Sequence, residues 1–294
     1  MTRRGWLLFG AMCVIWGIPY LMIRVAVREV SPATLVFLRS GLAALALIPL
    51  AAARGELRQL LPRWRPVLVF AAIEIAIPWL ALASAERRIS SSLAALLLAA
   101  VPFTAVAIAL ATGGERFGSR RIAGLLLGIG GVAAIVGLDL GHTSGVGVAE
   151  MAVVVIGYAS GPWVLSRYLS DLPSLGVIAA SLGVTAVVYI PVAAVQFPHT
   201  VPGSHVILSI LGLAVICTAL AFVLFFELIT EVGPVRSTVI TYINPAVAAL
   251  LGVAVLNESF TAGMGVGFAL VLAGSVVATG QAPQPATEPA SARP

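Results

Sequence analysis

The chain repeats one of its own segments, and this repeat constrains the fold more than any other feature. Residues 102–137 and residues 245–280 align without a gap at an offset of 143, and nine of the 36 aligned positions are identical. The identities place a proline, a glutamate, a phenylalanine and several glycines in one register, from Pro102 and Glu115 to Pro245 and Glu258. A single period near half the chain length indicates an internal duplication into two halves rather than a solenoid.

The composition places both halves in a lipid bilayer. Hydrophobic residues make up 60% of the chain and charged residues only 10%, which is too little polar surface for a soluble domain of this length. A helix needs about 20 mostly apolar residues to cross the hydrocarbon core. The sequence predicts an all-α integral membrane protein with ten such transmembrane helices, at residues 6–24, 33–53, 66–85, 89–111, 121–139, 147–167, 174–196, 206–229, 234–256 and 262–280.

Ten spans in two copies give five spans per copy, so the second copy enters the membrane upside down. The predicted division is a first five-helix repeat at residues 1–140, a second, inverted repeat at 146–280, and a disordered Pro- and Ala-rich tail at 281–294. Inverted repeats are typical of secondary transporters, whose substrate site lies near the middle of the membrane between the repeats. The duplication therefore favours transport by alternating access, although channels also use it.

The positive charge of the chain indicates orientation rather than nucleic-acid binding. All 17 basic residues are Arg, and twelve of them fall on one side of the membrane if the N-terminus is cytoplasmic. By the positive-inside rule we expect a multi-pass protein of the cytoplasmic (inner) membrane with both termini in the cytoplasm. The first span follows Arg3 and Arg4 as a signal peptide would, but it lacks a small-residue cleavage site, so we expect it to be retained.

Four prolines inside spans occur at equivalent depths in the two repeats. A proline removes a backbone donor and frees a carbonyl, which in hydrocarbon must find a partner or line a cavity. A single proline in a span is often a simple kink, but a matched kink in both repeats indicates a hinge. The predicted hinges are Pro19, Pro102, Pro162 and Pro245.

Two ionisable residues lie deep in spans, Arg39 in the second and Glu74 in the third. A charge at such depth is costly and faces protein or water rather than lipid. The depths of these two residues differ by about 9 Å at 1.5 Å per residue, so they are predicted to pair directly or through water. The pair either holds two helices together or serves transport, with Glu74 binding a coupled proton or a substrate amine.

Aromatic residues gather in the interior of the spans, where a Tyr or Trp needs a polar partner and tends to face a bundle or cavity. Each one alone is as readily a core residue, but together they predict an amphipathic pocket for an organic solute. The predicted substrate-binding residues are Trp16, Tyr20, Glu74, Trp79, Phe103, Tyr158, Trp163, Tyr242 and Asn244.

Other residues are expected to serve structure. Glu115 and Glu258 follow spans and are predicted to cap the helix that comes next, because the N-terminus of a helix favours a carboxylate. Glycines at small-xxx-small spacing favour close helix packing over dimerisation; they are Gly124, Gly128, Gly263 and Gly267. No metal site or cofactor is predicted, although the loop histidines (His142, His199 and His205) leave a surface metal open. The chain shows no His-Glu-x-x-His, Gly-x-Ser-x-Gly or Walker signature, so we expect no enzyme.

The duplicated stretch resembles a known family. Asn244-Pro245 through Asn257-Glu258, with the Gly-rich last span, is similar to the second repeat of the EamA family in the drug/metabolite transporter superfamily. Trp16-Gly17, Arg39 in Phe-Leu-Arg, and Pro102 to Glu115 resemble matching features of the first repeat. The resemblance implies ten spans in two inverted repeats and export of small metabolites, prominently amino acids. The resemblance does not indicate which ion, if any, is coupled to transport by this chain.

The sequence therefore predicts a secondary transporter that exports amino acids, aromatic ones among them, or related small metabolites. Export of drugs or organic cations is the alternative within transport, with Glu74 as the attraction. A membrane scaffold without transport activity is the alternative from another class, and costly polarity at mid-depth argues against it. Expected partners are the small-molecule substrate and the lipid bilayer, with no nucleic acid, and either a homodimer or a monomer.

Overall fold

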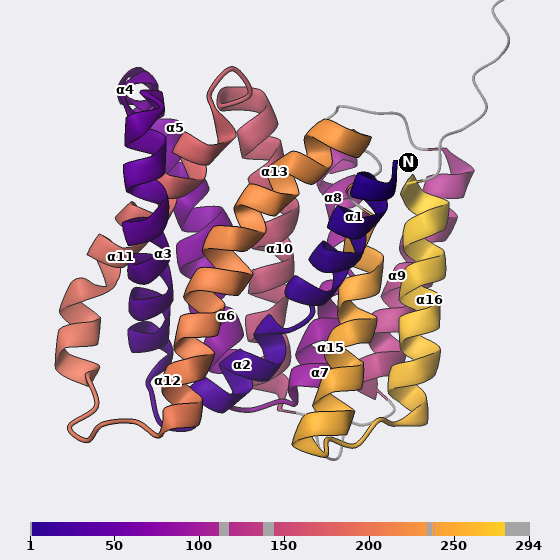
Figure 1. Ribbon diagram of the computed structural model, residues 1–294. Coiled ribbons are helices and arrows are strands. Elements are labelled where there is room, and N and C mark those ends of the chain that lie inside the picture. The colour runs from indigo at the N-terminus through magenta and orange to yellow at the C-terminus, as the bar shows by residue number, and fades with distance from the viewer. Residues whose placement is uncertain (1, 112–117, 138–143, 234–236, 238, 280–294) are drawn as a thin grey trace, which may run out of the picture.

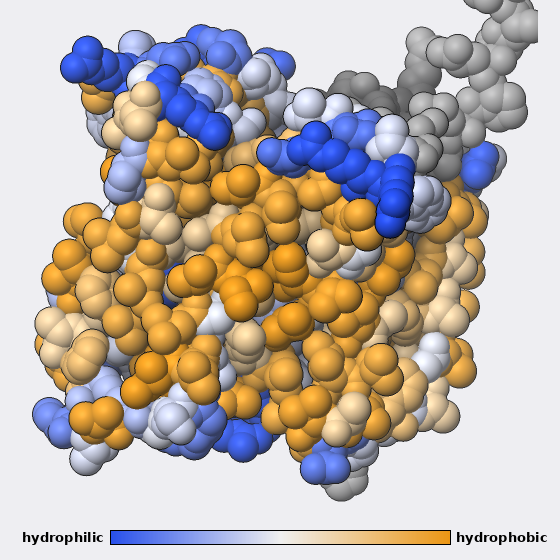
Figure 2. Space-filling view, viewed as in Figure 1, coloured by the Kyte–Doolittle hydropathy of each residue, from blue (hydrophilic) through white to orange (hydrophobic). Residues whose placement is uncertain are grey.

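The computed structural model describes residues 2–111, 118–137, 144–233, 237 and 239–279. All regular structure in these residues is helical, and the helices form one bundle (Figure 1). The bundle carries an apolar belt with hydrophilic residues gathered at both ends (Figure 2). Seven helical stretches are long and apolar enough to cross a membrane, and three shorter apolar helices at Ile122–Val136, Ile240–Leu256 and Ala262–Val277 complete the ten. The predicted all-α fold with two inverted five-helix repeats is confirmed.

The first repeat contains five spans, three of which are made of more than one helical segment. The bounds are α1 (Arg3–Ile15) with α2 (Pro19–Ala26); α3 (Pro32–Ala53); α4 (Glu56–Leu60), η1 (Leu61–Arg63), α5 (Trp64–Phe70), η2 (Ala71–Ala76) and α6 (Ile77–Ala85); α7 (Ser91–Leu98) with α8 (Val101–Ala111); and α9 (Ser119–Gly137). The second repeat contains α10 (Gly145–Tyr168); α11 (Ser174–Gln196); α12 (Ser204–Leu211), η3 (Gly212–Leu220) and α13 (Ala221–Val232); α15 (Ile240–Leu256); and α16 (Ala262–Thr279).

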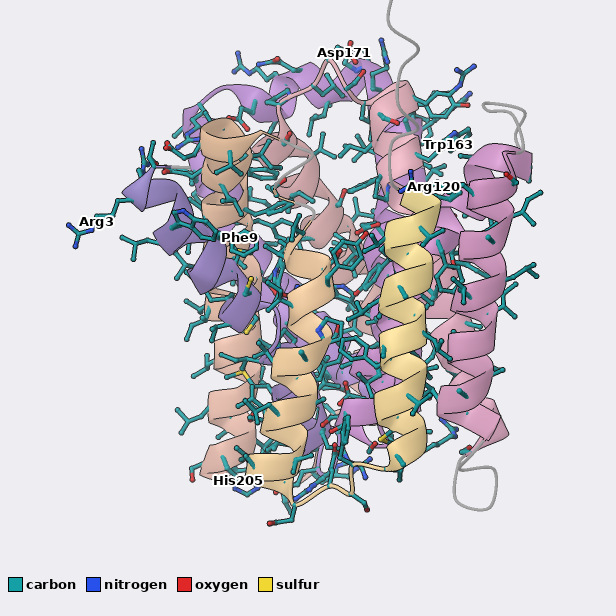
Figure 3. The ribbon with its side chains drawn as sticks, turned by 90° about the vertical axis from the view of Figure 1, so that its right-hand side faces the viewer. Arg3, Phe9, Arg120, Trp163, Asp171 and His205 are labelled. Carbon is teal, nitrogen blue, oxygen red and sulfur yellow. The ribbon has the colours of Figure 1, made fainter. Side chains whose placement is uncertain are left out.

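The two ends of the bundle differ in charge. We call the end that holds Arg3 and Asp171 the basic end and the end that holds His205 the far end (Figure 3). The arginine-rich segment 54–65 between the second and third spans lies at the basic end and is largely helical, since the chain turns at Gly55 with a left-handed φ of 70° and then enters α4. At this end Arg63 pairs with Asp171 at 3.2 Å.

The two repeats interlock rather than lying side by side. The two most extensive helix contacts join equivalent spans of the two repeats, α9 with α16 and α3 with α11, and the equivalent spans α7 and α15 are also in extensive contact. The remaining large contacts also come in equivalent pairs, since α6 packs on α10 as α13 packs on α1. The inverted duplication therefore produces a pseudo-twofold bundle in which each repeat completes the other.

Glycines allow α9 and α16 to touch backbone to backbone. A Cβ on Gly131 would lie 2.6 Å from the backbone nitrogen of Val271 and 2.7 Å from the carbonyl oxygen of Gly267. A Cβ on Gly274 would lie 2.5 Å from the backbone nitrogen of Gly128. Of the glycines predicted to serve packing, Gly124, Gly128 and Gly267 lie at this contact, where a Cβ on Gly267 would be 2.6 Å from the carbonyl oxygen of Gly131.

The paired prolines differ between the two repeats. In the first repeat Pro19 lies just after the break between α1 and α2, and Pro102 lies just after the break between α7 and α8. In the second repeat Pro162 lies inside the continuous helix α10 and Pro245 lies inside the continuous helix α15. Equivalent prolines therefore lie next to a helix break in the first repeat and inside a continuous helix in the second.

Each repeat also contains a π-helical stretch in its third span. These stretches are η2 and η3, and the offset of 143 carries residues 71–76 onto 214–219, inside η3. A π-helix widens the turn and is common at functional sites. The sequence gives a partial signal for the first one only, because Pro78 follows it and leaves the carbonyl of Glu74 without its helical donor.

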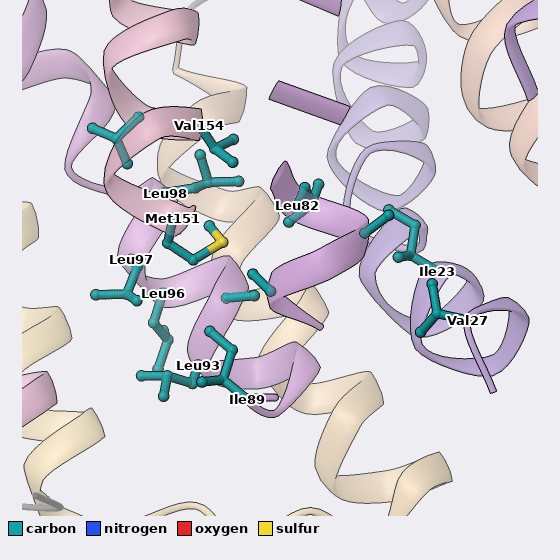
Figure 4. Packing of buried hydrophobic residues seen from close by; sticks show 14 of the residues in the cluster. Ile23, Val27, Leu82, Ile89, Leu93, Leu96, Leu97, Leu98, Met151 and Val154 are labelled. Atoms are coloured by element: carbon teal, nitrogen blue, oxygen red, sulfur yellow. The ribbon is translucent and has the colours of Figure 1, made fainter. Parts of the chain in front are cut away.

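The far end is closed by a packed hydrophobic cluster. The part drawn in Figure 4 lies on and next to α2, α6, α7 and α10, with Ile23 and Val27 facing Leu82 and with Met151 facing the leucines of α7, and the cluster extends to α12, η3 and α15. Ser90 caps α7 through its hydroxyl, which accepts from the N–H of Leu93 at 3.1 Å. The helices that form this end are thus fixed by their own caps and by mutual burial.

Candidate functional site

A buried arginine lies at the centre of the bundle. Arg39 on α3 is 8% exposed, its Nε donates to the hydroxyl of Thr218 at 3.0 Å, and its guanidinium carbon lies 3.7 Å from the ring centroid of Trp79. The Thr218 hydroxyl donates in turn to the carbonyl of Leu213 at 2.7 Å, a bond that spans the wide turn of η3. Within the described residues Arg39 forms no ion pair, so its charge is held by a ring face and a hydroxyl.

The second deep charge, Glu74, lies on η2. Its Oε2 is buried and has no hydrogen-bond partner in the described part of the chain. The carboxylate lies against α10, where a Cβ on Gly161 would overlap it and a Cβ on Gly157 would lie 2.6 Å from the carbonyl of Ile73. Arg39 and Glu74 make no direct ion pair, so a water-mediated pair stays a prediction.

Two tyrosines connect these charges. The hydroxyl of Tyr158 on α10 lies within electrostatic range of both Arg39 and Glu74 and beside the indole N–H of Trp79. The hydroxyl of Tyr20 on α2 lies within range of Arg39 and of Tyr158. We call the resulting group the central polar cluster: Tyr20, Arg39, Glu74, Trp79, Tyr158 and Thr218.

Three predicted pocket aromatics lie elsewhere. Trp16 packs on α13, with its ring centroid 4.7 Å from that of Phe225. Phe103 is buried on α8 against α9, where a Cβ on Gly128 would lie 2.8 Å from its ring. Trp163 is 39% exposed towards the basic end and pairs edge-on with Tyr168 at 6.0 Å (Figure 3).

The predicted polar contacts on α15 serve the helix bundle. The buried Asn244, with its amide nitrogen turned towards two carbonyls, donates to Ile240 at 3.0 Å and to Cys13 at 3.1 Å. At the break between α1 and α2 the N–H of Gly17 donates to Val14, which leaves the Cys13 carbonyl without its usual helical donor, and Asn244 supplies a partner for it. Tyr242 accepts a hydrogen bond from Ser275 on α16 at 3.3 Å.

Two buried polar residues were missed from the sequence, one in the central polar cluster and one outside it. Thr218 has no charge and lies in an apolar run. The one sequence signal for it is its place in the repeat: it follows Cys217, the residue equivalent to Glu74. Glu86 lies in an Ala-Glu-Arg-Arg turn typical of an exposed loop, yet it is fully buried and neither carboxylate oxygen has a partner in the described residues. No sequence signal distinguishes it from its exposed neighbours.

A cavity opens at the basic end. It has a volume of about 380 Å³, and Figure 2 shows a notch in this end of the molecule. Its lining contains charged residues of both signs together with apolar residues: Arg4, Arg54, Leu175, Val223, Phe226, Glu227, Thr230 and Glu231. Phe226, Phe222 and Thr218 follow each other at four-residue spacing along η3 and α13, on one face of the helix. This face connects the cavity with the central polar cluster.

The far end is held by polar contacts between the repeats. The carboxylate of Glu258 accepts from the backbone N–H groups of Ser91 and Ser92, at 2.8 and 2.9 Å, and from both serine hydroxyls. The prediction that Glu258 caps the next helix, α16, is wrong. The left-handed Asn257, with φ 55°, turns the carboxylate back to α7, and Thr261 caps α16 instead.

These contacts set the ionisation of Glu258. Burial alone would raise its pKa, but the hydrogen bonds from Ser92 and Ser91 outweigh burial and hold the pKa of Glu258 below its ordinary value. Nearby, Arg88 pairs with Glu150 at 2.9 Å, and Glu29 accepts from the N–H of Gly203 at 2.7 Å. The far end is therefore closed by charged groups that bridge different spans.

Several predicted features lie outside the described residues: Glu115, His142 and the tail at 281–294. Among the described residues there is no group of three or more His, Cys, Asp or Glu that fits a metal ion. His205 lies 3.2 Å from Glu29 at the far end. The central polar cluster can instead hold a solute by one cation, one carboxylate and aromatic faces.

Two interlocked five-helix repeats, a polar centre at mid-depth and a cavity at one end define a multi-pass membrane transporter of the inverted-repeat class. The profile of the EamA-like transporter family matches residues 3–137 and 145–280. The chain belongs to this family, which is part of the drug/metabolite transporter superfamily.

A solved structure supports the fold. One chain, described only as the crystal structure of a protein, superposes with a TM-score of 0.65 at 22% identity, covering 95% of this chain and 97% of that one. At this identity the likeness shows the fold alone. No curated protein matches the chain significantly in sequence.

Proposed function

We propose that the protein exports amino acids across the cytoplasmic membrane by alternating access, taking them up at the basic end. The observation that carries the proposal is that the guanidinium of Arg39 and the carboxyl group of Glu74 lie deep in the bundle with no ion pair between them in the described residues. A zwitterionic amino acid carries both complementary charges, and its carboxylate suits a guanidinium. The aromatic faces of Trp79 and Tyr158 suit an apolar or aromatic side chain.

The charge and the packing of the two ends support uptake of the substrate from the cytoplasm. The basic end carries the arginines that the positive-inside rule assigns to the cytoplasm, so both termini are cytoplasmic in this proposal. The cavity at this end offers Arg54 and Glu231 to a zwitterion, and the Phe226–Phe222 face leads inward. In this proposal the closed far end faces away from the cytoplasm, and the conformation described above is the one that receives substrate from the cytoplasm.

The test is counterflow in proteoliposomes of the purified full-length chain. Vesicles loaded with one unlabelled amino acid are diluted into the same labelled amino acid, over a panel of aromatic, aliphatic and charged ones. We expect transient accumulation of aromatic or large apolar amino acids, and its loss in an Arg39→Gln variant. Arg28→Gln, at an exposed arginine, is the matched control. The absence of counterflow for every amino acid contradicts the proposal.

A second substrate class, organic cations, is favoured by the unpartnered Oε2 of Glu74. The same vesicles distinguish the two classes with a labelled quaternary ammonium compound. Transport that survives Arg39→Gln and is lost in Glu74→Gln would assign the site to cations, because only the carboxylate then contacts the substrate. Loss in both variants assigns the site to zwitterions.

A further inference from the structure

Glu86 is a buried carboxyl that the proposed substrate site does not use. It follows the last residue of α6 and has no exposed surface, and both of its oxygens are buried without a hydrogen-bond partner in the described residues. Its chain neighbours Leu82 and Ile89 belong to the packed cluster that closes the far end (Figure 4). The carboxyl is therefore sealed from the far-end surface in this structure.

The charged and titratable groups around Glu86 leave its carboxyl unpaired. They are Tyr20 and Arg24 on α2, Arg39 on α3, and Glu258 between α15 and α16. Arg24 donates to the backbone carbonyl of Glu86 rather than to its carboxylate, and Arg39 is engaged by Thr218 and Trp79. Arg88, two residues on, is bound by Glu150.

An ionised carboxylate in this position would be unstable. It would be shut off from bulk solvent and would have no hydrogen-bond donor among the described residues, and the negative charge of Glu258 would repel it. A neutral carboxyl avoids most of this cost. Burial, the largest influence, raises the pKa of Glu86 well above its ordinary value, and the nearby Glu258 adds to the rise while Arg24 and Arg39 oppose it.

We infer that Glu86 is a proton-binding site, occupied while the far end is closed and emptied to the far-side solvent when that end opens. Opening admits water to the carboxyl and frees it to pair with Arg24, the nearest cation. The proton is taken from far-side water on closing and returned to it on opening, so no other group is needed to balance the step. The opening step rests on the proposed alternating access; the bound proton in the closed state does not.

Infrared spectroscopy tests the bound proton without any substrate. Purified full-length protein in lipid nanodiscs is examined for the C=O stretch of protonated carboxyl groups near neutral pH. We expect a band in the wild type that is lost in Glu86→Gln and kept in Glu150→Gln, the matched control whose carboxylate is paired with Arg88. Glu74→Gln separates the contribution of the other unpartnered carboxylate.

A band that Glu86→Gln leaves unchanged overturns the inference. Gel filtration establishes that each variant is folded. If Glu86→Gln does not fold, Glu86→Asp replaces it, and a shifted band then supports the inference whereas an unshifted band overturns it. Because no amino acid is present, failure of the proposed transport activity leaves this result standing, and failure here leaves counterflow standing.

Thiol labelling from the far side tests the link to opening. Ala94→Cys places a thiol at a fully buried position on α7, and Val201→Cys, at an 87% exposed position, reports the intrinsic reactivity of the reagent. With an impermeant maleimide on intact cells, the ratio of the two rates should rise as far-side pH rises, by up to about tenfold per pH unit for one linked proton. Adding Glu86→Gln should abolish the rise. A ratio independent of pH, or an equal rise in Glu86→Gln, overturns the link.

Discussion

The residues at the centre of the bundle show why a deep charge need not be paired. The guanidinium of Arg39 stacks on the ring of Trp79 and donates to the hydroxyl of Thr218, which itself donates to the carbonyl of Leu213. This arrangement satisfies one nitrogen of the guanidinium and leaves the planar fork able to meet a carboxylate. A lysine at this position would keep the charge but not the fork or the stacking.

Arg39→Lys tests this geometry. Hydrogen bonds to charged groups contribute about 1.5–3 kcal/mol, and each 1.4 kcal/mol is a tenfold change, so kcat/KM for amino-acid transport should fall about 10- to 100-fold. The initial rate of counterflow over a range of substrate concentrations measures it. Arg28→Lys, an exposed arginine, should leave the rate unchanged. Equal rates for Arg39→Lys and wild type would mean that the fork is not used.

The position of Glu74 depends on a glycine of the opposite repeat. A Cβ on Gly161 would overlap the Glu74 carboxylate, which can rotate away because it is the end of a flexible side chain. Gly161→Ala should therefore move the Glu74 carboxylate and reduce transport about tenfold, which is the effect of losing one hydrogen bond to a charged group. The free energy of unfolding should change by less than about 1 kcal/mol.

The matched control for Gly161→Ala is Gly10→Ala, a helical glycine with open space at its Cβ. Its transport should equal that of the wild type. Counterflow and the thermal unfolding midpoint in detergent measure the two effects. Large destabilisation without a specific loss of transport would show that the Gly161 contact serves packing alone.

At the residue scale the sequence predicts the charges but not their partners. Depth in a span indicates that Arg39 and Glu74 matter, because charge in hydrocarbon is costly wherever it points. The partner of Arg39 is a threonine on η3, and no pattern in the chain predicts the turn that orients it. The burial of Glu86 cannot be predicted from the sequence, because the residues around it are typical of an exposed turn and tertiary packing alone buries its side chain.

Among the elements, the pair α9 and α16 shows how sequence spacing determines contact. Gly131 and Gly130 are adjacent, yet a Cβ on Gly131 meets the backbone of α16 whereas a Cβ on Gly130 meets nothing within 4 Å. Backbone cannot rotate away as a side chain can. The two neighbours therefore offer a matched pair of positions on one helix.

Gly131→Ala should destabilise the protein by about 1–3 kcal/mol, because the two helices must separate to admit the methyl group. Gly130→Ala should leave stability unchanged or raise it by up to about 1 kcal/mol through helix propensity. Thermal unfolding in the same detergent compares them. Equal effects of the two substitutions would mean that the close contact between α9 and α16 contributes nothing.

The Glu258 cap on α7 has a pH dependence whose sign is fixed. Its pKa is lower in the folded state than its ordinary value, so it contributes stability above that ordinary value and loses the contribution as pH falls through the lowered pKa. The thermal midpoint of the wild type should decline in this acid range. In Glu258→Gln the midpoint should be lower near neutrality and the decline should be smaller. An identical decline in both proteins would contradict this role.

The elements themselves follow from the sequence more completely than their interruptions do. Ten apolar runs predict ten spans because a bilayer permits little else. The breaks at residues 16–18 and 99–100 coincide with predicted hinge prolines, but Pro162 and Pro245 carry no break. A proline permits an interruption, and the packing of the neighbouring helices decides whether it forms.

For the molecule as a whole, this difference between the repeats describes one of two states. Two copies of one sequence pattern take two conformations, broken in the first repeat and continuous in the second, and a cavity opens at the basic end. In an inverted-repeat transporter, exchange of these conformations between the repeats opens the other end. The far-end-open state should then have α10 broken at Pro162 and α15 broken at Pro245, with α1 and α2 joined into one helix.

Proline substitutions should therefore shift the two states in opposite directions. A proline inside a continuous helix costs about 3 kcal/mol, so Pro162→Ala removes that cost from the present state and Pro19→Ala removes it from the exchanged one. Far-side labelling of Ala94→Cys should fall in Pro162→Ala and rise in Pro19→Ala, by up to about a hundredfold. Pro49→Ala is the control. Pro49 lies inside α3 and Pro191, one residue short of the offset of 143, lies inside α11, so both repeats have a continuous helix here and there is no difference to exchange. A change in the same direction for Pro162→Ala and Pro19→Ala would mean that the prolines act as kinks and that the repeats do not trade conformations.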